Sequence, residues 1–195
     1  MKTTLVSALI IFSLLIFTGS ANAEDINPKV VLDTSKGKIV LELYPDNAPE
    51  TVKNFLNYVD AKFYDGMIFH RVIPNFMIQG GGFTTDMKRK TTRAPIKNEA
   101  DKGIKNDRGT IAMARTGDPH SATAQFFINS KNNDFLNHKS KTQQGWGYTA
   151  FGKVVDGMKT VDAISAVKTR TRGRIRDVPA EAVVIESARR QAIEK

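Results

Sequence analysis

The run FHRVIPNFMIQGGG, from Phe69 to Gly82, is mostly apolar but contains an arginine and a glutamine. Side chains alternate between the two faces of a strand, so Arg71 and His70 are expected to point in opposite directions. The same alternation places Gln79 on one face with Met77. Either the polar side chains face a pocket and act on a ligand, or they are structural. For Arg71 the structural alternative is a buried ion pair.

Two further segments have the same mixed character. Gln125-Phe126-Phe127 places an amide beside two aromatic residues, and Phe135-Leu136 is another apolar pair. Together with Arg71 and Gln79, these residues could line a hydrophobic pocket that contains one cation and two amides.

Several familiar catalytic arrangements are missing from the sequence. It has no cysteine, so it offers neither a thiolate nucleophile nor a cysteine-ligated metal. His70, His120 and His138 lack the H-E-x-x-H spacing of a zinc site, and no G-x-S-x-G motif is present. Residues 80–82 are glycines without the G-x-x-x-x-G-K-S/T pattern of a phosphate loop. We therefore expect no metal site, and we interpret His70 as a satisfied structural histidine and the other two as loop residues.

The rest of the chain predicts mostly short strands. Pro49 suits the first turn of a helix that continues to about Asp60, and Asp156 suits the N-cap of a second helix. Residues 80–107 resemble a loop, and residues 188–195 a frayed end or a short helix. Because regular helices do not separate the strands, an antiparallel barrel or sandwich with two packed helices is favoured over a parallel sheet. The predicted strands cover residues 29–34, 38–43, 67–73, 76–79, 109–114, 126–129, 148–155 and 183–185.

The N-terminal segment has the pattern of a secretory signal peptide. Lys2 provides a basic start, residues 5–17 are apolar, and Ala21-Asn22-Ala23 forms a small-residue cleavage site. A transmembrane anchor is the alternative, but the apolar run is shorter than the roughly 20 residues that a span requires. We predict a signal peptide over residues 1–23 and one domain over residues 24–195, with no stable membrane anchor. The expected location is the periplasm, with secretion from the cell as the alternative.

The net charge of +9 could indicate nucleic acid or an anionic membrane as a partner. The basic residues gather only in two short clusters, at residues 88–90 and 170–176, and no aromatic residues alternate with them. A solvated basic surface is therefore the favoured interpretation, and we expect no nucleic-acid partner.

The sequence resembles the cyclophilin family. FHRVIPNFMIQGG resembles the signature F-H-R-x-I-P-x-F-M-x-Q-G-G, GTIAMAR and ATAQFFI resemble the next two blocks, and FGKVVDGM resembles the block before the second helix. The similarity extends from Val30 to Ser187. It implies a mainly β fold, a closed eight-stranded antiparallel β-barrel capped by two α-helices. It also implies peptidyl-prolyl cis–trans isomerisation without metal or cofactor, on proline-containing polypeptides.

The resemblance also implies which residues form the site. Arg71 is expected to donate a hydrogen bond to the prolyl nitrogen, and Gln79 to hydrogen-bond the substrate backbone, so these two are the predicted catalytic residues. The predicted substrate-binding residues are Phe76, Met77, Ala114, Arg115, Thr116, Gln125, Phe127, Phe135, Leu136 and Tyr148.

Three positions depart from the family pattern. Phe135 stands where many members have a tryptophan that helps to bind cyclosporin, so weak cyclosporin A binding is expected. Tyr148 aligns with the usual pocket histidine after an insertion at residues 143–147, and keeps an aromatic wall and a hydroxyl. Arg115 stands where asparagine is common; it either widens selection toward acidic or extended substrates or is a solvated surface residue.

The predicted function is that of a monomeric prolyl isomerase acting on exported proteins. The alternative is a chaperone or adhesin module that binds proline-containing segments and catalyses only incidentally. Arg71 favours the enzyme, because binding alone would not require the cation. Nucleic-acid binding through the basic residues is the least favoured hypothesis.

Overall fold

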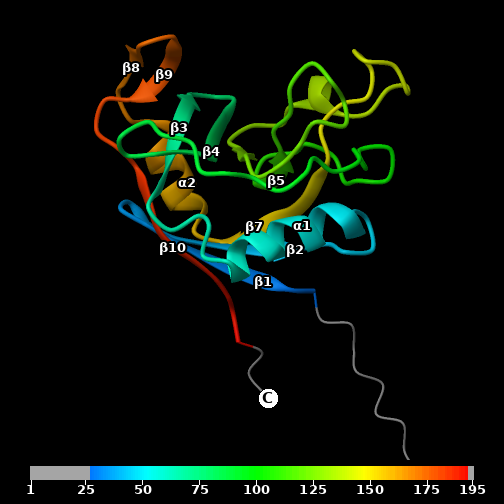
Figure 1. Cartoon of the computed structure of the whole chain (residues 1–195), viewed down its shortest axis with the longest axis horizontal. Helices are drawn as coiled ribbons and strands as arrows, with labels where there is room; N and C mark the ends of the chain where they lie inside the picture. Colours follow the sequence, from blue (N-terminus) through cyan, green and yellow to red (C-terminus); the bar gives the residue numbers. More distant parts are fainter. Residues whose placement is uncertain (1–26, 193–195) are drawn as a thin grey trace, which may run out of the picture.

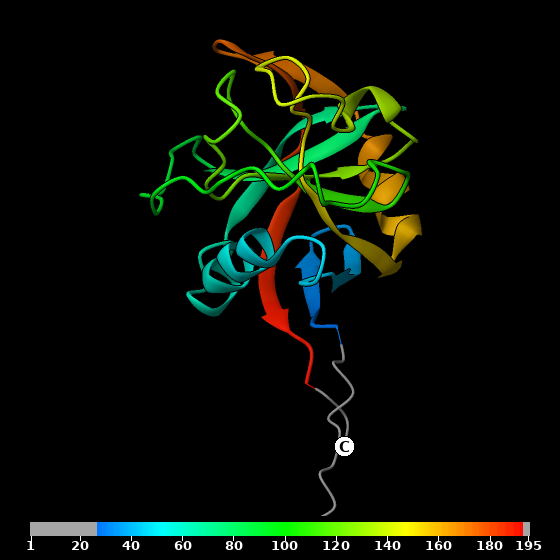
Figure 2. The same cartoon turned by 90° about the vertical axis from the view of Figure 1, so that its right-hand side faces the viewer.

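The computed structural model describes residues 27–192 (Figures 1 and 2). The predicted signal peptide lies outside these residues, as do the last three residues of the chain. Among the described residues, no helix is long and apolar enough to cross a membrane.

Eight strands form a closed antiparallel barrel in the order β1-β10-β3-β4-β6-β5-β7-β2. Two α-helices pack on it, α1 (Pro49–Asp60) and α2 (Met158–Ser165). This confirms the predicted fold class. The barrel strands are β1 (Lys29–Thr34), β2 (Gly37–Leu43), β3 (Met67–Ile73), β4 (Met77–Thr84), β5 (Thr110–Met113), β6 (Phe126–Asn129), β7 (Ala150–Asp156) and β10 (Val184–Arg190).

The barrel interior is filled by the apolar side chains that alternate along the strands. In β2, Ile39, Leu41 and Leu43 are buried, while the residues between them are partly exposed. Helix α1 adds Phe55, whose ring lies 5.3 Å from that of Phe151. The interior is therefore occupied by core side chains, and any binding site must lie on the outside of the barrel.

Helix α1 begins at Pro49 as predicted, but its N-terminus is stabilised by a distant residue. Ala48 has no side chain that could cap the helix. Instead, the carboxylate of Glu99 accepts the backbone N–H groups of Glu50 (3.2 Å) and Thr51 (2.8 Å). A carboxylate at this end of a helix satisfies free donors and interacts favourably with the helix dipole.

The predicted N-cap of the second helix was wrong by one residue. Asp156 is the last residue of β7, and Gly157 precedes the helix with a φ of 87°. Glycine adopts this left-handed conformation without steric cost, which allows the sharp turn from strand to helix. The carboxylate of Asp156 accepts the backbone N–H of Gly157 at 2.8 Å.

The predicted loop over residues 80–107 was also wrong at its start, because β4 continues through the three glycines to Thr84. The glycines are needed where the strand passes close to core rings. Gly81 has a φ of 74°, and a Cβ at this position would lie 2.8 Å from Cε1 of Tyr64. Aromatic packing therefore selects glycine within a strand.

Two further differences concern the end of the chain. Residues 188–190, expected to fray or to form a helix, belong to β10 and pair with β1. Residues 169–179 form a hairpin that the sequence did not predict, made of β8 (Thr169–Arg172) and β9 (Ile175–Pro179). Both views place this hairpin and α1 at opposite ends of the molecule (Figures 1 and 2).

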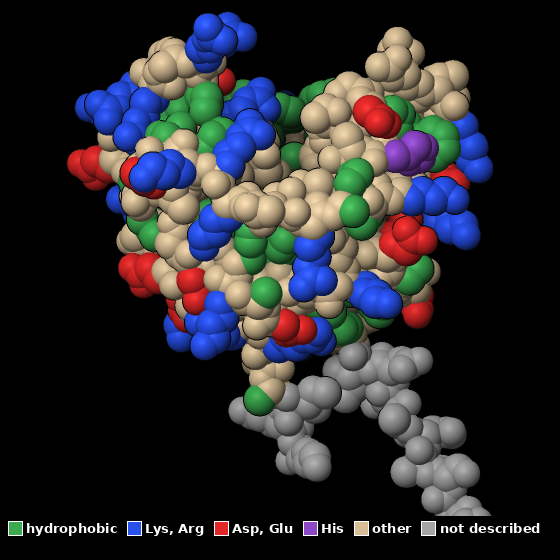
Figure 3. Space-filling view, in the orientation of Figure 1, with side chains coloured by type: hydrophobic (Ala, Val, Ile, Leu, Met, Phe, Trp, Pro, Cys, Tyr) green, Lys and Arg blue, Asp and Glu red, His purple; other side chains and the backbone are tan. Residues whose placement is uncertain are grey.

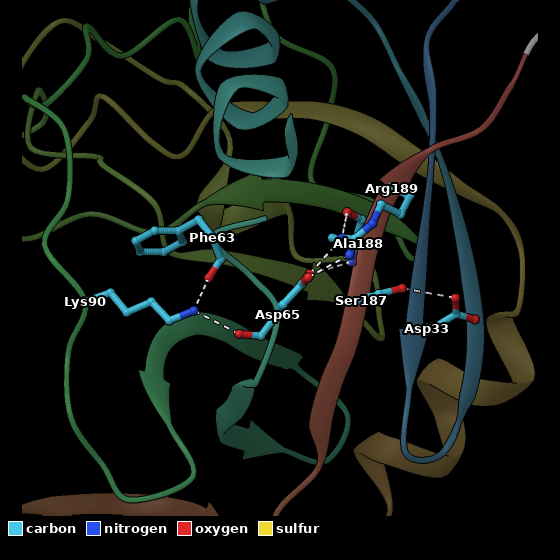
Figure 4. A network of polar contacts seen from close by, with 7 residues as sticks. All are labelled: Asp33, Phe63, Asp65, Lys90, Ser187, Ala188 and Arg189. Carbon is cyan, nitrogen blue, oxygen red and sulfur yellow. Dashed lines mark hydrogen bonds and ion pairs between the residues drawn. The ribbon is translucent and has the colours of Figure 1, made fainter. Parts of the chain in front are cut away.

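Asp65 connects β10 to the segment between α1 and β3 (Figure 4). Its two carboxylate oxygens accept hydrogen bonds from Arg189 at 2.8 and 2.7 Å, and one of them also accepts the backbone N–H of Ala188. These donors, with Arg189 first, hold the pKa of Asp65 below its usual value. Lys90 donates to the carbonyl oxygens of Phe63 and Asp65, at 2.6 and 2.8 Å, and is thereby fixed.

Candidate active site

A pocket of about 110 Å³ lies on the outside of the barrel. It brings together nine of the predicted site residues. They come from β3, β4 and β6, the turn between β3 and β4, the segment after β5, the 3₁₀-helix η1 (Asp134–Leu136) and the segment before β7. The lining residues are Arg71, Phe76, Met77, Gln79, Ala114, Arg115, Phe127, Leu136 and Tyr148.

The polar wall of the pocket is built across two neighbouring strands. Arg71 on β3 and Gln79 on β4 are direct partners in the strand register. Nη1 of Arg71 donates to Oε1 of Gln79 at 3.4 Å, and Nε2 of Gln79 donates to Oε1 of Gln125 at 3.0 Å. Gln125 does not line the pocket. It lies behind Gln79 and fixes the orientation of that amide.

The apolar wall is a cluster of its own, separate from the barrel core. Met77, Phe127 and Leu136 are buried in it, and Tyr148 packs edge-on against Phe127 with ring centroids 5.7 Å apart. The result is a small apolar slot. The sequence predicted one cation and two amides in its lining, whereas the structure places two guanidinium groups, of Arg71 and Arg115, and the single amide of Gln79 there.

Phe135 lies at the rim of the slot. Its side chain is 63% exposed, and its ring stacks on that of Phe76 with a centroid distance of 5.6 Å. Phe135 does not line the pocket itself. The stacked pair extends the apolar surface outward from the slot.

Arg115 is held in a fixed position beside the pocket. Its guanidinium lies 4.6 Å from the ring centroid of Tyr148, Nε donates to the carbonyl of Gly147 at 2.9 Å, and Nη1 donates to that of Thr116 at 2.9 Å. Of the two alternatives, the structure favours a site residue over a freely solvated one. Thr116 lies outside the pocket lining, and its backbone N–H donates to Oγ of Ser121.

His70 is buried, with 4% of its surface exposed. The pairing of β3 with β4 shifts register between Phe69 and Arg71, so the simple alternation that predicted opposite directions for His70 and Arg71 is interrupted at this residue. Burial lowers the pKa of His70 to about 4 and keeps the ring neutral. The expectation of a fully satisfied histidine was wrong, because Nδ1 has no hydrogen-bond partner within residues 27–192. The ring packs against Phe83 and does not line the pocket.

His120 and His138 have a structural role that the sequence did not reveal. Both rings pack edge-on against the buried indole of Trp146, at 4.8 and 5.6 Å. Nε1 of Trp146 donates to the carbonyl of Asn98 at 3.3 Å. This cluster fixes the segment that leads to Tyr148.

Buried asparagines also support the pocket, and they were not among the site residues predicted from the sequence. Nδ2 of Asn106 donates to the backbone carbonyl of Tyr148 at 3.1 Å. Nδ2 of Asn133 donates to the backbone carbonyl of Phe76 at 2.9 Å and to Oδ1 of Asn129 at 2.7 Å. A signal was available, since Asn129 directly follows a wholly apolar strand segment, where a buried amide requires partners.

Comparison with known proteins agrees with this geometry. The model of the family described as cyclophilin type peptidyl-prolyl cis-trans isomerase/CLD matches residues 29–190. The chain is 64% identical to the peptidyl-prolyl cis-trans isomerase cyp18 of Streptomyces antibioticus over 160 residues, which cover 82% of this chain and 96% of that protein. It is 50% identical to peptidyl-prolyl cis-trans isomerase A of Dickeya dadantii (strain 3937) over 188 residues, 96% of this chain and 97% of the relative.

A solved structure shows the same architecture. The cyclophilin type peptidyl-prolyl cis-trans isomerase of Cryptosporidium parvum, crystallised in the presence of the dipeptide Ala-Pro, aligns with a TM-score of 0.67 at 26% identity. The alignment covers 85% of this chain and 99% of that one.

The fold and the pocket together are those of a prolyl isomerase. More particularly, the chain belongs to the cyclophilin-type peptidyl-prolyl cis-trans isomerase family, and it is an isomerase enzyme.

Proposed function

We propose that Arg71 catalyses rotation about X-Pro bonds by stabilising the twisted amide, and that the substrates are exported polypeptides. The observation that carries the catalytic proposal is the apolar slot with the Arg71 guanidinium and the Gln79 amide on one wall.

The reaction requires only a change in the relative stability of amide conformers. Amide resonance gives a rotation barrier of about 18–20 kcal/mol. A turnover of roughly 10² to 10³ s⁻¹ corresponds to a barrier of about 13–15 kcal/mol, so the enzyme must supply about 3–7 kcal/mol. No covalent bond breaks, so neither a nucleophile nor a proton relay is needed. The site must bind the twisted form more tightly than the planar forms.

Arg71 meets this requirement. When the amide twists, the prolyl nitrogen loses conjugation and regains a lone pair that can accept a hydrogen bond. A guanidinium remains charged and presents rigid donors, and one such bond in a dry pocket supplies about 2–4 kcal/mol by analogy with oxyanion donors. Gln79 restricts the guanidinium by accepting from Nη1. Positioning of the substrate supplies the remainder.

The other lining residues would provide that positioning. Met77, Phe127 and Leu136 form a slot whose small volume suits a pyrrolidine ring. Gln79 would hydrogen-bond the substrate backbone, and the backbone of residues 114–116 would pair with the residue before proline. The Ala-Pro dipeptide used with the Cryptosporidium parvum relative supports proline as the group bound.

The proposal of export is supported by the pattern of residues 1–23. The alignment with the Dickeya dadantii isomerase covers 96% of this chain and therefore extends into that segment. Within the proposal, the periplasm is the site of action, secretion is the alternative, and the enzyme acts as a monomer.

Two experiments test the proposal. In a protease-coupled assay with a proline tetrapeptide, the purified enzyme should accelerate the cis-to-trans phase; no acceleration would refute the catalytic proposal and favour a module that only binds. For export, the full chain should be recovered from the periplasmic fraction, or from the medium, with its N-terminus at Glu24. Recovery of uncleaved chain from the cytosol would refute this part.

A further inference from the structure

The two basic clusters of the sequence lie together on one face of the molecule. Nη1 of Arg172 in the hairpin donates to the carbonyl of Thr85 at 3.2 Å, which places the hairpin beside the segment that contains Lys88 and Arg89. Seven exposed residues make up this basic face: Lys88, Arg89, Lys168, Arg170, Arg172, Arg174 and Arg176. Lysine and arginine side chains gather at the upper left of the space-filling view, over the position of β8 and β9 (Figure 3).

The charges of the hairpin are not neutralised by neighbouring acids. Within residues 27–192, Lys88 pairs with Asp86 at 2.8 Å, but none of the five basic residues from 168 to 176 has an ion pair. Arg189 and Arg190 differ from the hairpin residues, because they form ion pairs with Asp65 and Asp60. The hairpin therefore concentrates positive charge that is available to a partner.

The shape of the face restricts what the partner can be. The hairpin tip projects, since a Cβ built on Gly173 would have no atom within 4 Å. A projecting tip offers no groove for a peptide, and residues 168–176 contain no aromatic side chain on which a base could stack. Residues 168–179 contain five basic residues and one acid, Asp177, so the hairpin keeps an excess of positive charge. A broad surface that carries many phosphate groups matches both the shape and this excess of positive charge.

We propose that the basic face docks the enzyme onto bilayers that contain anionic phospholipids. Arginine is suited to this contact because its planar guanidinium binds phosphate through two parallel hydrogen bonds. Basic residues next to an anionic leaflet each add to the binding free energy, and the attraction decreases within a Debye length. Docking is peripheral and reversible, and it is independent of the Arg71 mechanism. The proposed export would bring the face to such lipids.

The direct test is co-sedimentation with vesicles made of phosphatidylglycerol and phosphatidylcholine, with phosphatidylcholine vesicles as the reference. The variant is Arg170→Gln/Arg174→Gln/Arg176→Gln, which keeps Arg172 and its bond to Thr85. The control is Lys29→Gln/Lys53→Gln/Lys62→Gln, which removes the same charge from exposed positions on β1 and around α1, at the other end of the molecule (Figure 1).

The wild type and the control should bind the anionic vesicles at low salt and release them as salt rises. The arginine variant should partition less well by roughly a hundredfold, with unchanged isomerase kcat/KM and melting temperature. Absence of wild-type binding to anionic vesicles, or an equal loss in both variants, would overturn the proposal. So would tighter binding of the wild type to duplex DNA than to the vesicles under the same conditions.

Discussion

Arg71 and Gln79 face each other across the β3–β4 ladder, and Nη1 of the guanidinium lies 3.4 Å from Oε1 of the amide. Gln125 accepts from Gln79 at 3.0 Å and so holds the amide in the orientation that presents its oxygen to Arg71. The direction of the cation thus depends on two amides, one in the pocket and one behind it.

Gly82→Ala tests this chain of contacts without altering any member of it. A Cβ at Gly82 would lie 2.7 Å from Cδ of Gln125 and 2.8 Å from Cε1 of His70, so Gln125 must move. We expect kcat/KM to decrease roughly ten- to a hundredfold through misplacement of Gln79 and Arg71. Gly117→Ala is the matched control, since its Cβ would make only an ordinary contact at 3.6 Å. Equal activity of the two variants would contradict the positioning role of Gln125.

The sequence predicted the pocket well where its residues are close together in the chain. Alternation alone pairs Met77 with Gln79, and the structure confirms this arrangement, since both line the pocket. Alternation did not reveal the register shift at His70 between Phe69 and Arg71. Leu136 could be suggested from its apolar pair with Phe135, but Tyr148 could be assigned only through the family resemblance. Their positions depend on contacts across the fold, such as the hydrogen bond from Asn106 to the Tyr148 carbonyl.

The fold errors have physical reasons of the same kind. The strand through residues 80–82 was mistaken for a loop because glycine disfavours strands by itself. Here the strand passes close to other side chains, and a Cβ at Gly81 would lie 2.8 Å from Tyr64 and one at Gly82 would lie 2.7 Å from Gln125. The β8–β9 hairpin was missed because every residue of β8 is exposed, so apolar and polar residues do not alternate in it. Contacts with residues distant in the sequence therefore determine the structure of both segments.

Asp65→Asn should destabilise the fold in a pH-dependent manner. Because Arg189 holds the pKa of Asp65 below its value in the unfolded chain, the charged form stabilises the fold above about pH 3.9, and this contribution is lost as the pH falls through the folded pKa. We expect the free energy of unfolding in urea at pH 7 to decrease by about 1–2 kcal/mol. The control Asp46→Asn, at an exposed turn, should change the free energy of unfolding little, both at pH 7 and below the folded pKa of Asp65. A loss that persists unchanged below the folded pKa would rule out the charge as its cause.

His70 should make stability depend on pH in a higher range. Its folded pKa of about 4 lies below the unfolded value of 6.5, so the unfolded chain takes up a proton first as the pH falls. Stability should therefore decline between pH 6.5 and 4, by at most about 3 kcal/mol from this group. Urea unfolding of His70→Gln should show a shallower decline over that interval. An identical slope in both proteins would mean that His70 titrates normally.

Phe135→Trp should strengthen inhibition by cyclosporin A. Phe135 already stacks on Phe76 at the rim but has no N–H group to donate. An indole at this exposed position would add one hydrogen-bond donor, worth roughly tenfold in the inhibition constant. The wild type should be inhibited only weakly, with turnover of a proline peptide nearly unchanged by the substitution. Nanomolar inhibition of the wild type would show that the indole is dispensable.

The central claim is tested most directly by kcat/KM of Arg71→Ala in the protease-coupled assay, with Arg71→Lys measured beside it. Loss of a bond worth about 2–4 kcal/mol should lower kcat/KM of the alanine variant by roughly 30- to 1000-fold. The lysine variant should recover part of the activity, since it retains the charge but lacks the rigid donors, and both should keep the wild-type circular dichroism spectrum. A folded Arg71→Ala enzyme within about twofold of the wild type would contradict the account, because the other cation in the lining, Arg115, is held against Tyr148 and two backbone carbonyls.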